Sequence, residues 1–296
     1  MTKNFTAIII LNQNRKNDIL ECLRSLFRMD YKEFEIIVVD NGSTDGSSEE
    51  IEKAFPDIHL IKNKINSGVA GGRNLGINYA DNKLNYTSIL FLDNDVVVEK
   101  KILSELIKSS EADKNAGIIT PKCYDMNSPG IIGYAGGMSV NFYTGTIKDI
   151  GGGEKDEGQF EEPEYVTSSG GIFLVRKEVI ELVGIFDEKF NPYGWEDVDF
   201  SIRAGKKGFK ILYSPKAIVY HKGGKKGKRE PAREYEFSKV KNYFYLIRKH
   251  ANVIQMFTIF PLFPFRAVSV FAKELIQGEF KIFALKVKGF LSLLKR

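Results

Sequence analysis

Two carboxylates stand two residues apart directly after an apolar run in the first third of the chain. Residues 88–92 are typical of a buried strand, and Asp93 and Asp95 follow it. In an extended chain, residues i and i+2 point to one face, so these two side chains can converge. Hard divalent cations prefer carboxylate oxygens and can bridge to phosphate. The pair therefore predicts a metal site, although an Asp-x-Asp pair by itself also fits a solvated loop.

Two later segments supply the other groups that such chemistry needs. Residues 194–199 read Gly-Trp-Glu-Asp-Val-Asp and place an acidic cluster where a helix is expected to begin. His221 follows another apolar run and could complete a metal shell, although a single histidine is more often structural. A metal, a phosphate and a nearby carboxylate base are sufficient to transfer a group from a nucleotide diphosphate.

Composition limits the class of protein. The chain has 296 residues, 43% of them apolar, which suffices for one large α/β domain with an appendage. The apolar run that begins at Phe5 is too short for a secretory signal peptide and lacks a small-residue cleavage site, so we expect none. Two cysteines do not form a disulfide framework, so we expect a cytoplasmic protein.

Charge is unevenly distributed. Residues 239–296 contain eleven Lys or Arg and two Asp or Glu, a net charge of +9, whereas residues 1–238 contain 32 basic and 36 acidic residues, a net charge of −4. The apolar part of this tail is too short to span a bilayer and contains two prolines. Its lysines alternate with Phe, Leu and Ile, as in a helix lying on an anionic membrane surface. A helical hairpin packed on the domain, or a homodimer contact, fits as well.

Hydrophobic periodicity predicts alternating strands and helices up to residue 120, and hence a mostly parallel sheet with helices on both faces. Ligands of such sheets lie at the carboxyl ends of the strands. The expected strands are 5–11, 35–39, 58–61, 88–92 and 117–120, and the expected helices are 16–27, 46–55, 69–80 and 99–113.

The predicted alternation of strands and helices ends at residue 120. Residues 121–165 are rich in glycine and predict antiparallel strands at 131–134 and 138–150, followed by a polar stretch that we expect to be mobile and beside the site. Further strands are expected at 171–175, 209–213 and 217–220, with helices at 177–183 and from about 195. We therefore divide the chain into a domain at 1–238, with a nucleotide-binding half at 1–120 and an acceptor half at 121–238, and a basic amphipathic helical tail at 239–296.

Five segments, taken together, resemble the family 2 glycosyltransferases, which have the Rossmann-like GT-A fold. In chain order they are residues 38–47 (VVDNGSTDGS), 66–76 (NSGVAGGRNLG), 91–95 (FLDND), 169–176 (SGGIFLVR) and 183–199 (VGIFDEKFNPYGWEDVD). The likeness covers roughly residues 5–225 and is nearest to the rhamnosyltransferase-like branch.

The residue types suit a nucleotide site without that likeness. Asn12 and Asp40 end buried strands, and a carboxylate such as Asp40 can accept the imide N–H of a pyrimidine. Gly68 and its neighbouring glycines let backbone approach a ligand before a helix whose N-terminus favours anions. Arg73 offers a fork for phosphate or base.

The resemblance adds roles for the remaining residues. It implies that Asp93 contacts the ribose and shares the metal, Mn²⁺ or Mg²⁺, with Asp95 and His221. Asp197 is the expected general base, and Glu196 orients the acceptor or its loop. The donor and acceptor sugars are expected around three residues, Gly170, Gly171 and Trp195, although Trp195 is equally suited to the core.

We therefore expect an inverting, metal-dependent glycosyltransferase that moves a sugar from a UDP- or dTDP-sugar to a hydroxyl of a glycan or lipid-linked acceptor, in cell-surface polysaccharide assembly. No nucleic-acid partner is expected. The alternative is a non-catalytic glycan- or nucleic-acid-binding protein on the same scaffold. A dinucleotide-dependent oxidoreductase or a sugar-phosphate nucleotidyltransferase would need a glycine-rich loop after the first strand, where residues 11–15 have none. The expected location is the cytoplasm, or the cytoplasmic face of the membrane as a peripheral protein.

Overall fold

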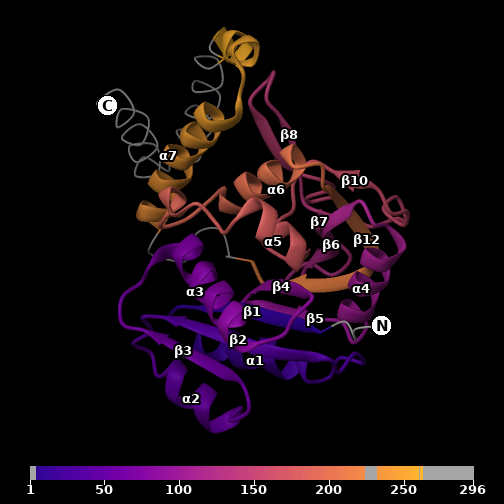
Figure 1. The fold of residues 1–296 in the computed structure, drawn as a ribbon. Coiled ribbons are helices and arrows are strands. Elements are labelled where there is room, and N and C mark those ends of the chain that lie inside the picture. The colour runs from indigo at the N-terminus through magenta and orange to yellow at the C-terminus, as the bar shows by residue number, and fades with distance from the viewer. Residues whose placement is uncertain (1–4, 224–231, 260, 263–296) are drawn as a thin grey trace.

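The computed structural model describes residues 5–223, 232–259 and 261–262. Figure 1 shows a central sheet with helices on both faces, with the N-terminal half below and the acceptor half, ending in α7, above. The helices are α1 (Lys16–Leu26), α2 (Ser47–Ala54), α3 (Gly68–Lys83), α4 (Ile102–Ala112), α5 (Lys177–Val183), the short 3₁₀ helix η1 (Glu188–Phe190), α6 (Glu196–Lys206) and α7 (Ala232–His250).

The strands of the main sheet follow one another in the order β10-β12-β6-β11-β4-β1-β2-β3, and β5 and β7 pair with β12 and β6. A separate hairpin is formed by β8 and β9. The bounds are β1 (Thr6–Asn12), β2 (Phe34–Asn41), β3 (His59–Asn63), β4 (Ser88–Asp93), β5 (Val96–Val98), β6 (Ala116–Asp125), β7 (Ile132–Ala135), β8 (Met138–Asn141), β9 (Thr146–Asp149), β10 (Tyr165–Val166), β11 (Phe173–Arg176) and β12 (Lys210–His221).

The predicted, mostly parallel sheet is confirmed. Its two groups of parallel strands are joined by β11, which runs in the opposite direction. β1 pairs in parallel with β2 and β4, β2 with β3, and β6 with β12. β11 is antiparallel to both of its neighbours, β4 and β6. Two successive reversals leave β4 and β6 running the same way. The carboxyl ends of β1, β2, β4, β6 and β12 therefore meet at one edge.

The core consists of two apolar layers, one on each face of the sheet. Along β1, Ile8 and Ile10 face the layer that includes α1, α2 and α4, whereas Ala7 and Ile9 face the layer that includes α3, α5 and α6. Successive side chains of a strand point to opposite faces, so a strand covered on both sides is apolar throughout. This explains the continuous apolar runs from which the strands were predicted.

The glycines of α3 let it lie unusually close to its neighbours. A Cβ at Gly72 or Gly76 would stand 2.2 Å or 2.5 Å from side-chain carbons of β1. At Gly68 it would stand 2.4 Å from Asn191 Oδ1. We had expected these glycines to make room for a ligand. In the structure they make room for β1 and for a loop of the acceptor half.

The polar stretch at residues 151–164 is bound to the sheet by side-chain contacts, which argues against the mobility expected of it. The buried ammonium of Lys122 on β6 pairs with Asp156 at 3.1 Å and with Glu161 at 2.5 Å. Tyr213 Oη donates to Phe160 O at 3.0 Å. A buried ammonium needs such partners, because unpaired it would carry a large desolvation cost. The antiparallel strands expected in this region are present.

The C-terminal part differs in its boundaries from the predicted ones. The two strands expected at 209–213 and 217–220 form one strand, β12, with an irregular register between Ser214 and Ile218. The domain boundary expected at residues 238 and 239 falls inside α7. Most of the tail beyond α7, residues 263–296, lies outside the described residues. Among the helices that the structure describes, none combines the length and apolarity that crossing a membrane requires.

Candidate active site

Asp93, Asp95 and His221 meet at the carboxyl edge of the sheet. One ligand atom from each lies within 4.8 Å of the others. The reason is local: the chain reverses after Asp95, and the short strand β5 pairs antiparallel with β12, so that Val96 stands opposite His221. His221 Nε2 lies 3.0 Å from Asp95 Oδ1. The structure thus brings together the three residues expected to hold a metal.

The charges of this cluster are already partly balanced within the protein. Burial raises the pKa of Asp95, but the hydrogen bond and charge of His221, together with Arg15, outweigh burial and hold that pKa below its usual value. Burial lowers the pKa of His221, but its bond to Asp95 and the charges of both aspartates outweigh burial and raise that pKa. Arg15 also contacts the second oxygen of Asp95. The carboxylates of Asp93 and Asp95 therefore favour a positively charged group beside them.

Glu196 and Asp197 occupy the first turn of α6 and are buried. Burial, followed by the negative charge of Glu196, raises the pKa of Asp197 to about 7. Burial also raises the pKa of Glu196, against the lowering effect of Arg73. Glu196 Oε2 accepts the Gly194 N–H at 3.0 Å. The two neighbours thus differ: Glu196 is tied to the backbone, whereas Asp197 has a pKa suited to exchanging protons at neutral pH.

The buried side chain of Arg73 lies between two acidic residues, Asp93 and Glu196. Its guanidinium donates to Gly171 O at 2.9 Å and lies 3.6 Å from Asp93 Oδ1 and 3.5 Å from Glu196 Oε1. The rings of Phe91 and Phe186 lie 5.7 and 5.4 Å from it. The residue is only 4% exposed. Its guanidinium is therefore engaged with protein groups, whereas the sequence suggests a guanidinium that contacts phosphate or base.

Asn12 and Asp40 stand side by side in the register of β1 and β2. Asp40 accepts the Ser43 N–H at 3.0 Å and the Ser48 hydroxyl. Asn12 donates to the Ser43 hydroxyl at 3.4 Å and accepts from Asn94 Nδ2 at 2.8 Å. Both oxygens of Asp40 are thus engaged in shaping the loop after β2, a function that its position at a strand end did not reveal.

The glycines of β11's leading loop lie against site residues. A Cβ at Gly171 would stand 2.9 Å from Asp93 Oδ2, and one at Gly170 would stand 2.9 Å from the ring of Tyr134. Any side chain at Gly171 would displace the carboxylate of Asp93. Gly171 is therefore needed for the position of Asp93, whatever else it contacts.

Trp195 precedes α6 in a left-handed conformation with φ of 73°. Its Nε1 donates to Lys239 O on α7 at 2.8 Å, and its ring meets that of Tyr243 edge-on at 6.1 Å. The ring is half-buried, so its burial does not decide between contact with a sugar and a place in the core, the two roles that fit the sequence. It is held in place by α7, whose Lys239 Nζ lies 5.4 Å from the centre of the ring.

Four polar residues at the site were not predicted from the sequence. Each acts through a contact distant in sequence, and none belongs to a motif that predicts such a contact: Arg15, Asn94, Asn191 and Asn242. Asn191 Oδ1 accepts the Gly71 N–H at 3.4 Å, and Pro192 O accepts the Val69 N–H at 3.0 Å. The N-terminus of α3 is thus covered by the acceptor half, and Gly68 faces Asn191 and not an open cleft.

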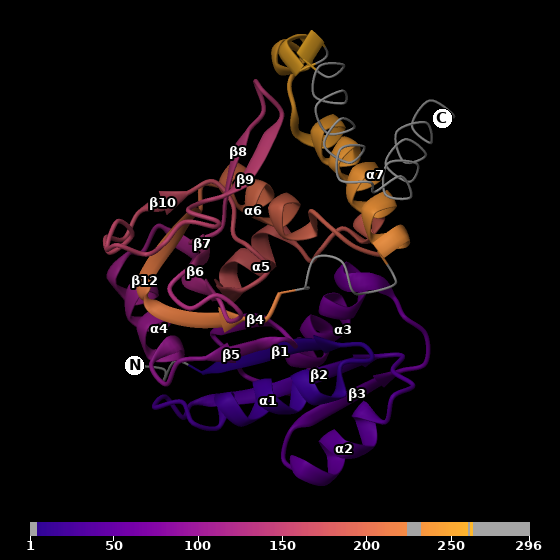
Figure 2. The ribbon, with the colours of Figure 1, turned by 180° about the vertical axis from the view of Figure 1, so that it is seen from behind.

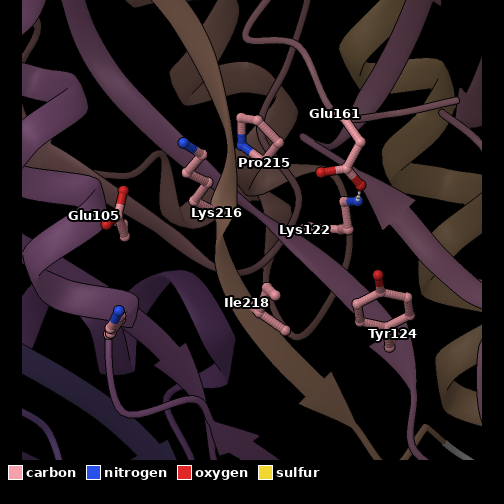
Figure 3. Close-up of a pocket in the computed structure, with 8 residues that line it drawn as sticks. Glu105, Lys122, Tyr124, Glu161, Pro215, Lys216 and Ile218 are labelled. Carbon is pink, nitrogen blue, oxygen red and sulfur yellow. Dashed lines mark hydrogen bonds and ion pairs between the residues drawn. The ribbon is translucent and has the colours of Figure 1, made fainter. Parts of the chain in front are cut away.

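A separate surface cavity of about 320 Å³ lies along α4, β6 and β12 (Figure 3). Lys122 and Glu161 lie next to each other on one side of it, Glu105 of α4 lies on another, and Lys101 is also among its lining residues. None of its lining residues belongs to the cluster of Asp93, Asp95 and His221. The cavity is therefore distinct from the candidate active site.

Comparison with solved structures shows the fold. A crystal structure of GalNAc-T7 with UDP, GalNAc and Mn²⁺ superposes with a TM-score of 0.67 at 17% identity, covering 87% of this chain and 50% of that one. A mannosyltransferase from Pyrobaculum calidifontis, in complex with GDP-Man and Mn²⁺, gives a TM-score of 0.59 at 16% identity, covering 99% of this chain and 81% of that one. The chain thus has the GT-A fold expected from its sequence.

Sequence relatives indicate the family. The low-salt glycan biosynthesis hexosyltransferase of Haloferax volcanii is 29% identical over 212 residues, which is 69% of this chain and 63% of that protein. The N-acetylglucosaminyl-diphospho-decaprenol L-rhamnosyltransferase of Mycobacterium tuberculosis is 25% identical over 235 residues, 73% of this chain and 76% of that protein. The chain spans less than two thirds of the first of these. The family profile described as glycosyl transferase family 2 matches residues 7–183, so the chain belongs to that family.

Proposed function

We propose that this protein is an inverting glycosyltransferase that moves a sugar from a nucleotide diphosphate sugar, UDP- or dTDP-linked, to a hydroxyl of a glycan or lipid-linked acceptor. One observation carries the proposal. Arg73 contacts Asp93 of the cluster of Asp93, Asp95 and His221 on one side and Glu196 on the other, and the buried carboxylate of Asp197 belongs to the residue next to Glu196. A cation-binding group and a base of raised pKa are thus held in one rigid unit.

The first part of the proposal concerns the metal. The cluster offers two carboxylates and one imidazole at the carboxyl edge of the sheet, a set that suits Mn²⁺ or Mg²⁺. Asp93, Asp95 and His221 would hold the ion. When bound, it supplies positive charge that neutralises the diphosphate as it leaves. Two structurally similar proteins are described as complexes with Mn²⁺, which supports the choice.

The second part concerns the nucleotide. Asn12, Asp40 and Asp93 end neighbouring parallel strands, and we place base and ribose along this row. The loop after β2 has a defined shape, because the carboxylate oxygens of Asp40 accept hydrogen bonds from Ser43 and Ser48. Gly68 and Arg73 act indirectly, by setting how closely α3 and the acceptor half approach this row.

The third part concerns the transfer step. Asp197 accepts the proton of the acceptor hydroxyl as that oxygen bonds to the anomeric carbon, and the bond to the diphosphate breaks on the opposite side. A single displacement of this kind inverts the anomeric configuration. A base pKa near 7 suits proton transfer at neutral pH. Glu196 orients the loop through Gly194, while Gly170, Gly171 and the half-buried ring of Trp195 border the sugars.

We place this activity in cell-surface polysaccharide assembly, as a cytoplasmic protein that docks on the membrane. The relative from Mycobacterium tuberculosis is named for a decaprenol-linked substrate, and a lipid-linked acceptor would require such docking. The structure adds a feature in favour of it. On the helical segment after α7, Val253, Ile254 and Phe257 expose most of their apolar side chains. The basic residues of the remaining tail follow directly in the sequence.

Removing one metal ligand tests the nucleotide site. Asp95→Ala should abolish the metal-dependent part of UDP and dTDP binding, because the cation loses a carboxylate and its link to His221. The measurement is isothermal titration with and without Mn²⁺. Glu105→Gln, in the separate cavity of Figure 3, is the control and should bind as wild type does. Equal Mn²⁺-dependence in Asp95→Ala and wild type would show the assignment to be wrong.

Replacing the base by its amide tests the transfer step. Asp197→Asn should bind donor nucleotide normally but lose transfer by about 10²–10⁴-fold, because shape is kept and basicity is removed. The measurement compares sugar transfer with nucleotide affinity in one preparation. Near-normal turnover would move the base elsewhere, and Glu196→Gln would then be the next variant to measure.

Two aspartates of the same helix should respond to pH in opposite directions. Asp197 has a folded pKa of about 7, above that of an unfolded chain, so the folded protein loses stability as pH rises from about 4 through 7. Asp197→Asn removes this loss. It should unfold at least about 2–4 °C above wild type at pH 8 and near wild type at pH 4.

Asp199 provides the matched comparison. Burial raises its pKa, but bonds to His250, Lys249 and Arg203 outweigh burial and lower it to about 2. This stabilises the fold above about pH 4 and is lost as pH falls through 2. Asp199→Asn should therefore unfold below wild type at pH 7. Thermal unfolding from pH 4 to 8.5 measures both variants, and a less stable Asp197→Asn at pH 8 would contradict the raised pKa.

The docking proposal is tested on the full chain. Phe257→Ser should lower binding to anionic vesicles by about tenfold, because burying one such side chain contributes roughly 1.5–3 kcal/mol. Ile65→Ser is the control, since Ile65 and Phe257 are both 77% exposed. Co-sedimentation across a salt series is the measurement, with binding weakened but not lost at high salt. Equal recovery of both variants with the vesicles would exclude a docking role for this face.

A further inference from the structure

The helix α7 lies outside the part of the chain that the family profile matches, yet it contacts the loop that leads to Asp197. Seen from behind in Figure 2, α7 rises from this loop beside α6, at the same end of the molecule as the β8–β9 hairpin. Tyr243 of α7 donates to Gly145 O, between β8 and β9, at 2.5 Å. α7 therefore contacts the β8–β9 hairpin as well as the loop of residues 187–195.

The most buried polar contact between them belongs to Asn242. Its side chain is 0% exposed and donates to Phe190 O and, at 2.8 Å, to Tyr193 O. Two carbonyls of an irregular loop thus receive their hydrogen bonds from one side chain of another element. Buried carbonyls require such donors, so the path of the loop depends on this amide.

A second contact fixes the residue that starts α6. Trp195 takes a left-handed backbone conformation that non-glycine residues rarely adopt, and its indole donates to Lys239 O of α7 at 2.8 Å. Lys239 Nζ lies 5.4 Å from the centre of the same ring. Glu196 and Asp197 follow at once in the chain. The direction in which their side chains leave the backbone is therefore set at a residue that α7 holds.

A third set of contacts joins α7 to Asp187 and Asp199, on either side of the loop. Lys249 pairs with Asp187 and Asp199, each at 2.7 Å, and His250 lies 2.7 Å from Asp199 Oδ1. Tyr245 Oη donates to Asp187 at 2.8 Å. Both ends of the segment from Asp187 to Asp199 are thus bound to α7, with Asn242 in the middle.

We propose that Asn242 is a positioning residue for the transfer reaction, and that α7 belongs to the catalytic unit because it sets the geometry of residues 195–197. The kinetic part of this inference rests on the proposed function. The structural part does not, because it concerns the order of a loop that can be observed without substrate.

The chain offers a specific reporter, since Trp195 is its single tryptophan. Asn242→Leu keeps the approximate volume but removes both donors, and Asn242→Asp keeps the shape with an ionised group that has no donor. Leu246→Ala is the matched control. Leu246 is buried on the same helix and packs with Phe190, but it makes only apolar contacts there.

Fluorescence excited at 295 nm should show Trp195 more accessible to acrylamide in both Asn242 variants than in Leu246→Ala at an equal loss of thermal stability. Donor-nucleotide affinity should stay within about twofold of wild type. Turnover should fall on the order of 10²-fold, as displacement of a reacting group by about 1 Å can cause.

The outcomes separate the two claims. Equal quenching in the Asn242 variants and Leu246→Ala would overturn the positioning role, since loss of packing would then explain the effect. Altered quenching with wild-type turnover would overturn it too, because the loop would move without consequence. If wild type itself transfers no sugar, the proposed function fails, and the quenching still decides whether Asn242 orders the loop.

Discussion

The site depends on one buried positive charge. Glu196 and Asp197 are buried neighbours at the start of α6, and Asp93, at the end of β4, is partly exposed; gathering these acidic groups without a counter-charge would be strongly unfavourable. The guanidinium of Arg73 lies between them, within 3.6 Å of Asp93 and 3.5 Å of Glu196, and also holds the carbonyl of Gly171. Because a guanidinium stays charged at any physiological pH, this arrangement does not loosen when its neighbours exchange protons. α3 carries this charge, and the close approach of α3 to β1 through Gly72 and Gly76 determines where it lies.

The sheet supplies the other constraint. Parallel strands bring their carboxyl ends to one edge, so residues from distant parts of the chain meet there without any local signal. β11, which runs antiparallel to both β4 and β6, joins the two parallel parts of the sheet and keeps their directions the same. The reversal at β5 then carries Asp95 to His221, 126 residues away. Strands from residues 1–120 and strands from later residues thus share one edge as parts of one sheet.

Much of this could be predicted because apolar periodicity is a local property. The strands ending at Asn12, Asp40 and Asp93 are buried on both faces, and their continuous apolar runs revealed them. The convergence of Asp93, Asp95 and His221 followed from strand ends. What could not be predicted are contacts made by side-chain amides. Asn191 caps α3 from 120 residues away, and Asn242 holds a loop about 50 residues earlier. An asparagine that serves a distant backbone has the same sequence signature as one in a turn. For the same reason the sequence does not reveal the contacts of Asp40, Gly68 and Arg73 with protein groups, and their contacts with a ligand stay predictions.

The pairing of Asp95 with His221 also has a consequence for synthesis of the chain. At about 5–20 residues per second, a ribosome needs roughly ten seconds to make the 126 residues that separate them. During that interval the first parallel strands can form and present both aspartates without the histidine or Asp197. Arg15, which is made first and contacts Asp95 in the finished protein, is available to neutralise it from the start. The nascent half can thus keep its acidic edge balanced and remain compact until β12 arrives. Completion of the cluster of Asp93, Asp95 and His221 is then a late event, and it coincides with completion of the sheet itself.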